Sequence, residues 1–133
     1  MDQGSTVRGL GRVYRFYYGL IEELLDYAEH EFSISKPDKK GTSQREHLLE
    51  VQRQTGKTPK ELEGPPFPTL VSHIWSAFVA LSSARSMGMS GPDSLSYTEI
   101  KNWMDVTNNR LSARDVEAIK SLDVIYITTR NAI

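Results

Sequence analysis

The sequence predicts an all-α fold: a small helical domain of about five helices, with a long N-terminal amphipathic helix and a compact C-terminal three-helix unit. Two observations indicate this class. Two short segments open with a serine followed three residues later by an acid, Ser96 with Glu99 and Ser112 with Asp115, which is the pattern of a helix capping box. Apolar residues also recur at steps of three and four near the N-terminus, as they do along one face of a helix.

The first predicted helix runs from about Val7 to Phe32 and has a wide apolar stripe. The members of the stripe are Leu10, Val13, Tyr14, Tyr17, Leu20, Ile21, Leu24, Leu25, Tyr27 and Ala28. Gly11 and Gly19 each weaken this helix by roughly 1 kcal/mol relative to alanine, and its opposite face is acidic. A stripe this wide must be covered, either by the rest of the domain or by another chain. The helix is therefore predicted to pack on the core or to form an oligomer contact.

A polar linker over residues 33–41 follows, and it divides the chain into an N-terminal segment, 1–42, and a helical domain, 43–133. Ser43 is predicted to cap a short helix that ends near Thr55, before Gly56. Pro59 is predicted to open one further helical turn. The prolines within residues 64–68 exclude a helix there and mark the clearest boundary in the chain.

Three helices are predicted after these prolines, and each has its own set of inward-facing residues. The first set is Val71, Ile74, Phe78 and Leu81, in a helix that Gly88 or Gly91 ends. The second set is Ile100, Trp103 and Met104, in a helix that starts at Ser96. The third set is Val116, Ile119, Leu122 and either Tyr126 or Val124, in a helix that starts at Ser112. Residues 87–95 are predicted to form an ordered surface turn, and the β-branched residues of 124–129 leave a β-rich ending open beside the favoured helical one.

Composition excludes several classes of function. The 16 basic and 17 acidic residues nearly cancel, so the chain lacks the basic excess of a protein that neutralises many phosphates. The absence of cysteine excludes disulfides and thiolate metal sites. The apolar runs are too short for a membrane span, and the N-terminus lacks the apolar region of a secretion signal. We expect an intracellular protein that binds neither nucleic acid nor membrane.

The pattern of reactive residues predicts no enzyme activity, no metal and no cofactor. His30, His47 and His73 lie on three separate predicted helices, without the i, i+4 spacing of a zinc pair. A G-x-S-x-G nucleophile turn and a glycine-rich phosphate loop are both missing from the sequence. Among the acids, Glu99 and Asp115 are assigned to the capping boxes, and we interpret the others, including Asp123, as solvated.

The two predicted helices within 96–127 also suggest a helix-turn-helix, in which the second helix enters the major groove of DNA. That second helix carries Arg114 and Lys120 against three acids, Asp115, Glu117 and Asp123. A net acidic helix is repelled by the phosphate backbone. Structural packing is therefore the favoured interpretation of this pair.

Exposed aromatic and apolar residues remain as the candidate binding surface. In the C-terminal unit the candidates are Phe67, Trp75, Phe78, Arg85, Met87, Met89 and Trp103. Of these, Phe67, Trp75, Met87, Met89 and Trp103 would line a groove for a partner segment together with Pro65 and Pro66. In the first helix they are Tyr17, Leu20 and Leu24. Methionine adapts to irregular surfaces and tryptophan anchors interfaces. The alternative is that Trp75 and Trp103 are simply the largest core residues.

The order and spacing of these elements over residues 68–127 resemble the tail assembly chaperones of long-tailed bacteriophages. The stretch LVSHIWSAFVALSSARSMGMSGPDSLSYTEIKNWMDVTNNRLSARDVEAIKSLDVIY carries the likeness. Its elements are an aromatic helix with Trp75, Phe78, Leu81 and Arg85; a Gly91-Pro92 loop; a Leu95-Ser96 start with Glu99, Ile100 and Trp103; and a Leu111-Ser112 start with Val116, Ile119, Leu122, Asp123 and Tyr126. A looser likeness extends back through REHLLEVQRQTGKTPKELEGPPFP.

The resemblance implies a non-enzymatic chaperone in the host (bacterial) cytoplasm. Its implied partners are the phage tape measure protein and the tail tube protein, whose subunits it helps recruit during tail morphogenesis. The first helix would serve as a client-binding arm or as the site of a homo-oligomer. Two other classes stay open: a phage-encoded inhibitor that docks on a host protein, and a small helical DNA-binding regulator built on residues 96–127.

Overall fold

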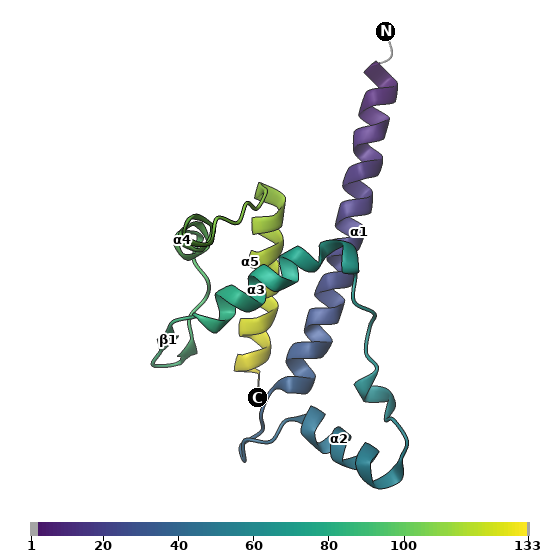
Figure 1. The fold of residues 1–133 in the computed structure, drawn as a ribbon, viewed down its shortest axis with the longest axis vertical. Coiled ribbons are helices and arrows are strands. Elements are labelled where there is room, and N and C mark those ends of the chain that lie inside the picture. Colours follow the sequence, from purple (N-terminus) through teal and green to yellow (C-terminus); the bar gives the residue numbers. More distant parts are fainter. Residues whose placement is uncertain (1–2, 133) are drawn as a thin grey trace.

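The computed structural model describes the backbone of residues 3–132 and the side chains of residues 11–132. This part of the chain forms five α-helices (Figure 1): α1 (Gln3–Ser35), α2 (Gln44–Thr55), α3 (Ser72–Ser83), α4 (Tyr97–Thr107) and α5 (Ala113–Asn131). Two single 3-10 turns, η1 (Lys60–Leu62) and η2 (Thr69–Val71), and two strands of two residues each, β1 (Met87–Gly88) and β2 (Gly91–Pro92), complete it. The prediction of a helical domain with a long first helix is confirmed.

The core lies where α1, α3 and α5 meet. The second half of α1 packs along α5, and α3 packs across α5 (Figure 1). The buried members of this core are Ile21, Leu24 and Ala28 from α1, Val71 from η2, Ile74, Ala77, Phe78 and Leu81 from α3, Leu95 from the loop before α4, Ile100 from α4, and Ala118, Ile119 and Leu122 from α5. Part of the N-terminal segment 1–42 thus belongs to the same core as the C-terminal helices.

An aromatic cluster fills the space where α1 meets the start of α3. Trp75 is its centre, and neighbouring ring centroids lie 4.9 to 6.5 Å apart. The rings that surround Trp75 are those of Tyr27, Phe32, Phe67 and Phe78. Aromatic pairs at these separations add about 0.5–1.5 kcal/mol each beyond the area they bury. Trp75 is therefore a packing residue in this fold.

Both predicted capping boxes form, and their geometry reflects the length of the acidic side chain. The amide of Ser96 donates to Glu99 Oε2 over 2.7 Å, and the amide of Ser112 donates to Asp115 Oδ2 over 3.2 Å. Each serine hydroxyl in turn accepts from the amide of its acid over 3.1 Å. The shorter aspartate reaches back less well, so the second box is the looser one.

Several element boundaries differ from the prediction. α1 continues to Ser35, into the predicted linker, because Ile34 is buried with 2% of its surface exposed. α3 ends at Ser83 rather than at Gly88 or Gly91, and these two glycines pair in the β1–β2 hairpin instead. At the C-terminal end the favoured helical ending is confirmed over the β-rich alternative, since α5 stays helical to Asn131.

The interpretation of Asp123 as a solvated acid is also wrong. Asp123 is buried, and Nη1 of Arg85 lies 2.6 Å from its Oδ1 atom. The other carboxylate oxygen accepts a hydrogen bond of 2.8 Å from the amide of Leu95. Asp123 occupies the same face of α5 as Ile119, Leu122 and Tyr126, so the helix directs it inward and Arg85 supplies the opposite charge.

Arg85, which the sequence placed among the candidate binding residues, is held inside the fold by several partners. It donates to the carbonyl oxygen of Asp93 over 2.9 Å and to the hydroxyl of Ser82 over 3.1 Å. Its guanidinium carbon lies 4.4 Å from the centroid of the Tyr126 ring. With its side chain only 3% exposed, Arg85 joins the end of α3 to the loop before α4 and to α5.

Removing one charge of this pair should be strongly destabilising, because it leaves the other buried and unpaired. We expect Asp123→Ala to lower the free energy of unfolding by about 3–5 kcal/mol, measured by urea denaturation followed by circular dichroism. Asp105→Ala, at an exposed acid of α4, is the control and should change it by no more than about 0.5 kcal/mol. The double variant Arg85→Met/Asp123→Leu should regain most of the loss, since apolar residues can replace a buried pair; a double variant as unstable as Asp123→Ala would contradict the charge explanation.

Candidate functional site

The first half of α1 extends beyond the rest of the domain (Figure 1). We call residues 3–16 of this helix the arm. Within it, Val13, Tyr14 and Phe16 have 58%, 44% and 62% of their surface exposed, and Tyr18 just below it has 54%. Leu10, a member of the predicted stripe, lies outside the described side chains. The apolar stripe of α1 is therefore covered by the body only in its second half.

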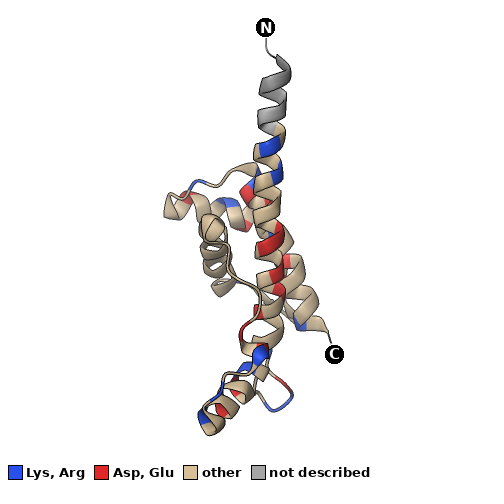
Figure 2. Cartoon of the chain, turned by 90° about the vertical axis from the view of Figure 1, so that its right-hand side faces the viewer, with Lys and Arg blue, Asp and Glu red and all other residues tan. Residues whose placement is uncertain are grey.

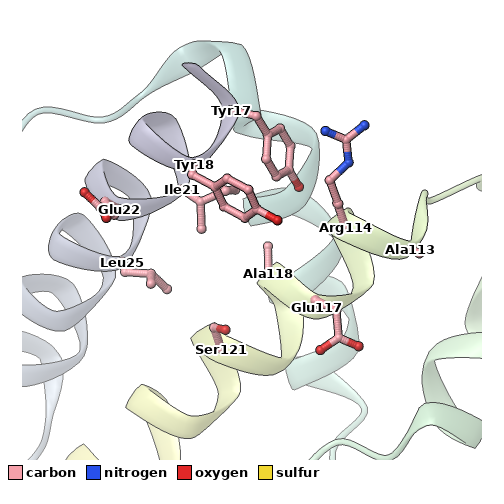
Figure 3. A pocket seen from close by; sticks show the side chains of 10 residues that line it. All are labelled: Tyr17, Tyr18, Ile21, Glu22, Leu25, Ala113, Arg114, Glu117, Ala118 and Ser121. Carbon is pink, nitrogen blue, oxygen red and sulfur yellow. The ribbon is translucent and has the colours of Figure 1, made fainter. Parts of the chain in front are cut away.

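An apolar groove runs beside this exposed stripe, between α1 and α5 (Figure 3). Its volume is about 430 Å³. The residues that line it are Tyr17, Tyr18, Ile21, Glu22 and Leu25 from α1, and Ala113, Arg114, Glu117, Ala118 and Ser121 from α5. We call it the α1–α5 groove. Its α5 wall consists of small residues flanked by two charged ones, so the backbone of another helix can approach closely.

A second hollow of about 180 Å³ is lined by Glu29 of α1 and by Val124, Ile125, Thr128 and Thr129 of α5. Ser121, Ile125 and Thr128 follow one another at steps of four and three, so they lie on one face of α5. The two hollows therefore lie in line on the same side of the α1–α5 pair, and Val124, which lines the second, has 65% of its surface exposed.

Asp115 joins α1, α3 and α5 at the end of the groove where α5 begins. Its Oδ1 atom accepts a hydrogen bond of 3.1 Å from the hydroxyl of Tyr17 in α1, and it lies 3.5 Å from Nε2 of His73 in α3. Next to it, the guanidinium carbon of Arg114 lies 4.7 Å from the Tyr14 ring centroid and 5.1 Å from that of Tyr17. These contacts fix the start of α5 against α1 where the arm leaves the body.

The environment of Tyr17 changes its acidity. Burial of the phenol, together with the nearby negative charge of Asp115 and the hydrogen bond to it, raises the pKa of Tyr17 to about 12. The hydroxyl therefore stays protonated, and able to donate to Asp115, throughout the physiological pH range.

The histidines serve separate local contacts. His30 bonds the carbonyl oxygen of Glu61 over 2.7 Å, and His47 lies 3.7 Å from an oxygen of Asp38. Within residues 11–132, no group of three or more histidine, aspartate or glutamate side chains is arranged to hold a metal ion. In the same part of the chain, no helix combines the length and the apolar character that crossing a membrane requires.

The candidate binding residues of the C-terminal unit do not form one groove. Phe67 precedes α3 beside α1, whereas Met87 and Met89 lie on the hairpin beyond the other end of α3 (Figure 1). Met87 is 68% exposed and Met89 fully so. Trp103, like Trp75, is half-buried against the core.

Two more of the candidates lie fully inside. Phe78 of α3 is 2% exposed and Leu24 of α1 is 0% exposed, so with Arg85 they offer no surface to a partner in this fold. Tyr17 and Leu20 are partly buried against the core. Of these, Tyr17 contributes to the wall of the α1–α5 groove.

The α5 wall of the groove was missed by the sequence reasoning. Ala113, Ala118 and Ser121 are small and only weakly hydrophobic, so the strongly apolar residues of the last helix do not indicate this face. A signal was present in their spacing, because Arg114, Ala118, Ser121 and Ile125 recur at steps of four, three and four on the helix face next to the buried one.

A helical domain with an open apolar groove and an uncovered aromatic arm is typical of a protein that binds other proteins. The model of one family, described as phage tail assembly chaperone, matches residues 51–128. This match covers more than half of the chain, and the protein belongs to that family. No curated protein and no solved structure matches the chain. The matched residues include the α5 wall of the groove, whereas α1 lies outside them.

The raised pKa of Tyr17 can be tested by titrating tyrosinate absorbance. The difference between the wild-type curve and that of Tyr17→Phe should have its midpoint near pH 12, compared with about 10 for an unperturbed tyrosine. Because the folded pKa is the higher one, the stabilisation from protonated Tyr17 is complete below about pH 10 and is lost as the pH rises toward 12. Asp115→Asn should move the midpoint downward, and a difference curve centred at pH 10 would contradict the burial of this phenol.

Proposed function

We propose that this protein is a non-enzymatic tail assembly chaperone that binds the phage tape measure protein in the host cytoplasm and helps recruit tail tube subunits. Membership of the tail assembly chaperone family supports the chaperone role. The observation that carries the binding mode is the α1–α5 groove, an apolar track open to solvent. The client would be held there until tube subunits assemble around it.

The groove fits an amphipathic helix as its client. Two antiparallel or parallel helices leave between them a furrow into which a third can pack, with its apolar residues at i, i+3, i+4 and i+7 as anchors. Tyr18, Ile21 and Leu25 form the larger wall, and Ala118 and Ser121 form the small-residue wall that lets the client backbone approach. Arg114 and Glu117 at the rim can pair with charges that flank the client's apolar face.

The exposed methionines form a second proposed contact. Met87 and Met89 lie on the β1–β2 hairpin, where the Gly91 backbone, with φ of +123°, turns the chain. Methionine side chains adapt to different apolar surfaces. We assign this hairpin to contact with a tail protein because the side chains of Met87 and Met89 are largely exposed.

The proposal can be tested by co-expressing the chain with the tape measure protein encoded near it. We expect a soluble stoichiometric complex, with the tape measure protein insoluble when expressed alone. Ser121→Arg places a long charged side chain in the groove at an exposed position, and we expect it to reduce the recovered complex at least tenfold. Asn102→Arg, at an exposed position of α4 outside the groove, is the matched control and should leave the yield unchanged.

Two results would count against the proposal in different ways. A tape measure protein that stays insoluble, while this chain elutes alone, would remove the chaperone role. A complex that forms equally well with Ser121→Arg and with wild type would keep the role but place the client elsewhere. Circular dichroism of each variant confirms that the fold is intact before binding is compared.

A further inference from the structure

We propose that the client helix of the α1–α5 groove carries its charges in two blocks, with acids at the end beside the arm and lysine or arginine at the other end. This inference rests on the proposed function and names the chemistry of the client. The observation that carries it is the order of charges along the groove, which changes from positive to negative on both walls.

The charges of α1 are separated along the helix. Residues 3–21 hold three arginines and no acid, whereas residues 22–31 hold five acids and neither lysine nor arginine. Figure 2 shows this change along α1. Arg15, Glu22, Asp26 and Glu29 follow one another at steps of seven, four and three, so they lie on one face of the helix. Glu22 lines the groove and Glu29 lines the second hollow, and this face therefore forms the outer rim.

The charges of the α5 wall change sign in the same order. Arg114 and Glu117 both line the groove and are three residues apart. Arg114 is level with the arm, since its guanidinium carbon lies 4.7 Å from the Tyr14 ring centroid. Glu117, which accepts a hydrogen bond from Tyr97, follows it along α5, and α5 runs in the same direction as α1 (Figure 1). Both walls are thus positive where α5 begins and negative further along.

Arg114 is placed to bind a carboxylate of the client. The rings of Tyr14 and Tyr17 lie beside its guanidinium group, which holds the group in position. None of the ion pairs within residues 11–132 includes Arg114, and the carboxylate of the neighbouring Asp115 accepts from Tyr17 and Ser112 instead. A guanidinium group presents a planar set of N–H donors that matches a carboxylate. An acid of the client would therefore complete this contact.

The acids on the rim of α1 favour a basic partner. Glu22, Asp26 and Glu29 are exposed, and the ion pairs within residues 11–132 do not include them. Like charges three or four residues apart on a helix repel each other. A lysine or arginine of the client beside these acids relieves that repulsion.

A client that fits both walls is therefore a helix with segregated charges. An evenly acidic helix would be repelled by Glu22 and Asp26, and an evenly basic one by Arg15 and Arg114. Arg15 and Glu29 are 14 residues apart on α1, which is about 21 Å at 1.5 Å per residue. The client helix needs about four turns to place one block beside each of them.

Two charge reversals test this order of charges in the co-expression with the tape measure protein. Arg15→Glu/Arg114→Glu makes the arm end of the groove acidic, and Glu22→Lys/Asp26→Lys makes the other end basic; all four positions are exposed. Each variant leaves the groove with one sign of charge, which a helix with two blocks matches in neither direction. We expect each to reduce the recovered complex at least tenfold.

Two matched controls change the net charge of the chain by the same amounts outside the groove. They are Lys57→Glu/Lys101→Glu and Glu63→Lys/Asp105→Lys, all at exposed positions. Both should leave the yield of complex unchanged. Circular dichroism of the four variants shows whether the fold is intact before the yields are compared.

The pattern of yields separates the alternatives. One reversal that weakens the complex while the other strengthens it would show a client of a single charge sign and overturn the inference. Two reversals without effect, when Ser121→Arg still reduces the complex, would overturn the inference and keep the proposed function. A wild-type chain that recovers no soluble client would remove the proposed function, and this inference with it.

The acidic end of the client can be located by crosslinking. Arg114→Lys keeps the positive charge and supplies an amine, which a carbodiimide joins directly to a carboxylate in contact with it. Mass spectrometry should find the joined Asp or Glu at one end of an amphipathic segment that has lysine or arginine at its other end. The wild-type complex is the control, because arginine does not react. No crosslink beyond those of the wild type, or one within a basic block, would contradict the inference.

Discussion

The buried pair of Arg85 and Asp123 is the constraint on which the rest of the domain depends. Taking two charges out of water is costly, so they must meet with close geometry and fixed partners. The pair ties the end of α3 and the loop at Leu95 to the middle of α5, and this determines which face of α5 turns inward. As a result, Ser121 and Ile125, on another face of α5, turn toward solvent beside α1.

Asp115 fixes the orientation of the first turn of α5. Its carboxylate accepts one hydrogen bond from the amide of Ser112 in the capping box and another from the hydroxyl of Tyr17 in α1, and it lies close to His73 of α3. Asp115 thus holds the start of α5 against α1, and Asp123 holds its middle against Arg85 and Leu95. The groove is thus a product of polar contacts on the two helices, although its walls are apolar.

The parts of the fold that could be predicted from the sequence are those governed by near neighbours. Ser96 with Glu99 and the stripe of α1 involve residues within one or two turns, so local rules suffice. The burial of Asp123 could not be predicted from its neighbours in sequence, since it requires Arg85 from the loop after α3. The groove could not be predicted because Ala118 and Ser121 form its wall through their small size, which gives no hydrophobic signal. The exposure of Tyr14 could not be predicted because it depends on where the rest of the domain ends along α1.

The continuity of α1 from the core into the arm has a further consequence for recognition. Leu24 and Ala28 anchor the helix inside the domain, and the same helix carries Tyr14 and Phe16 outside it. Helix formation is cooperative and its costly step is nucleation, which the buried half has already completed. The arm is therefore preorganised, and whatever docks on it loses less conformational entropy than it would in ordering a flexible segment.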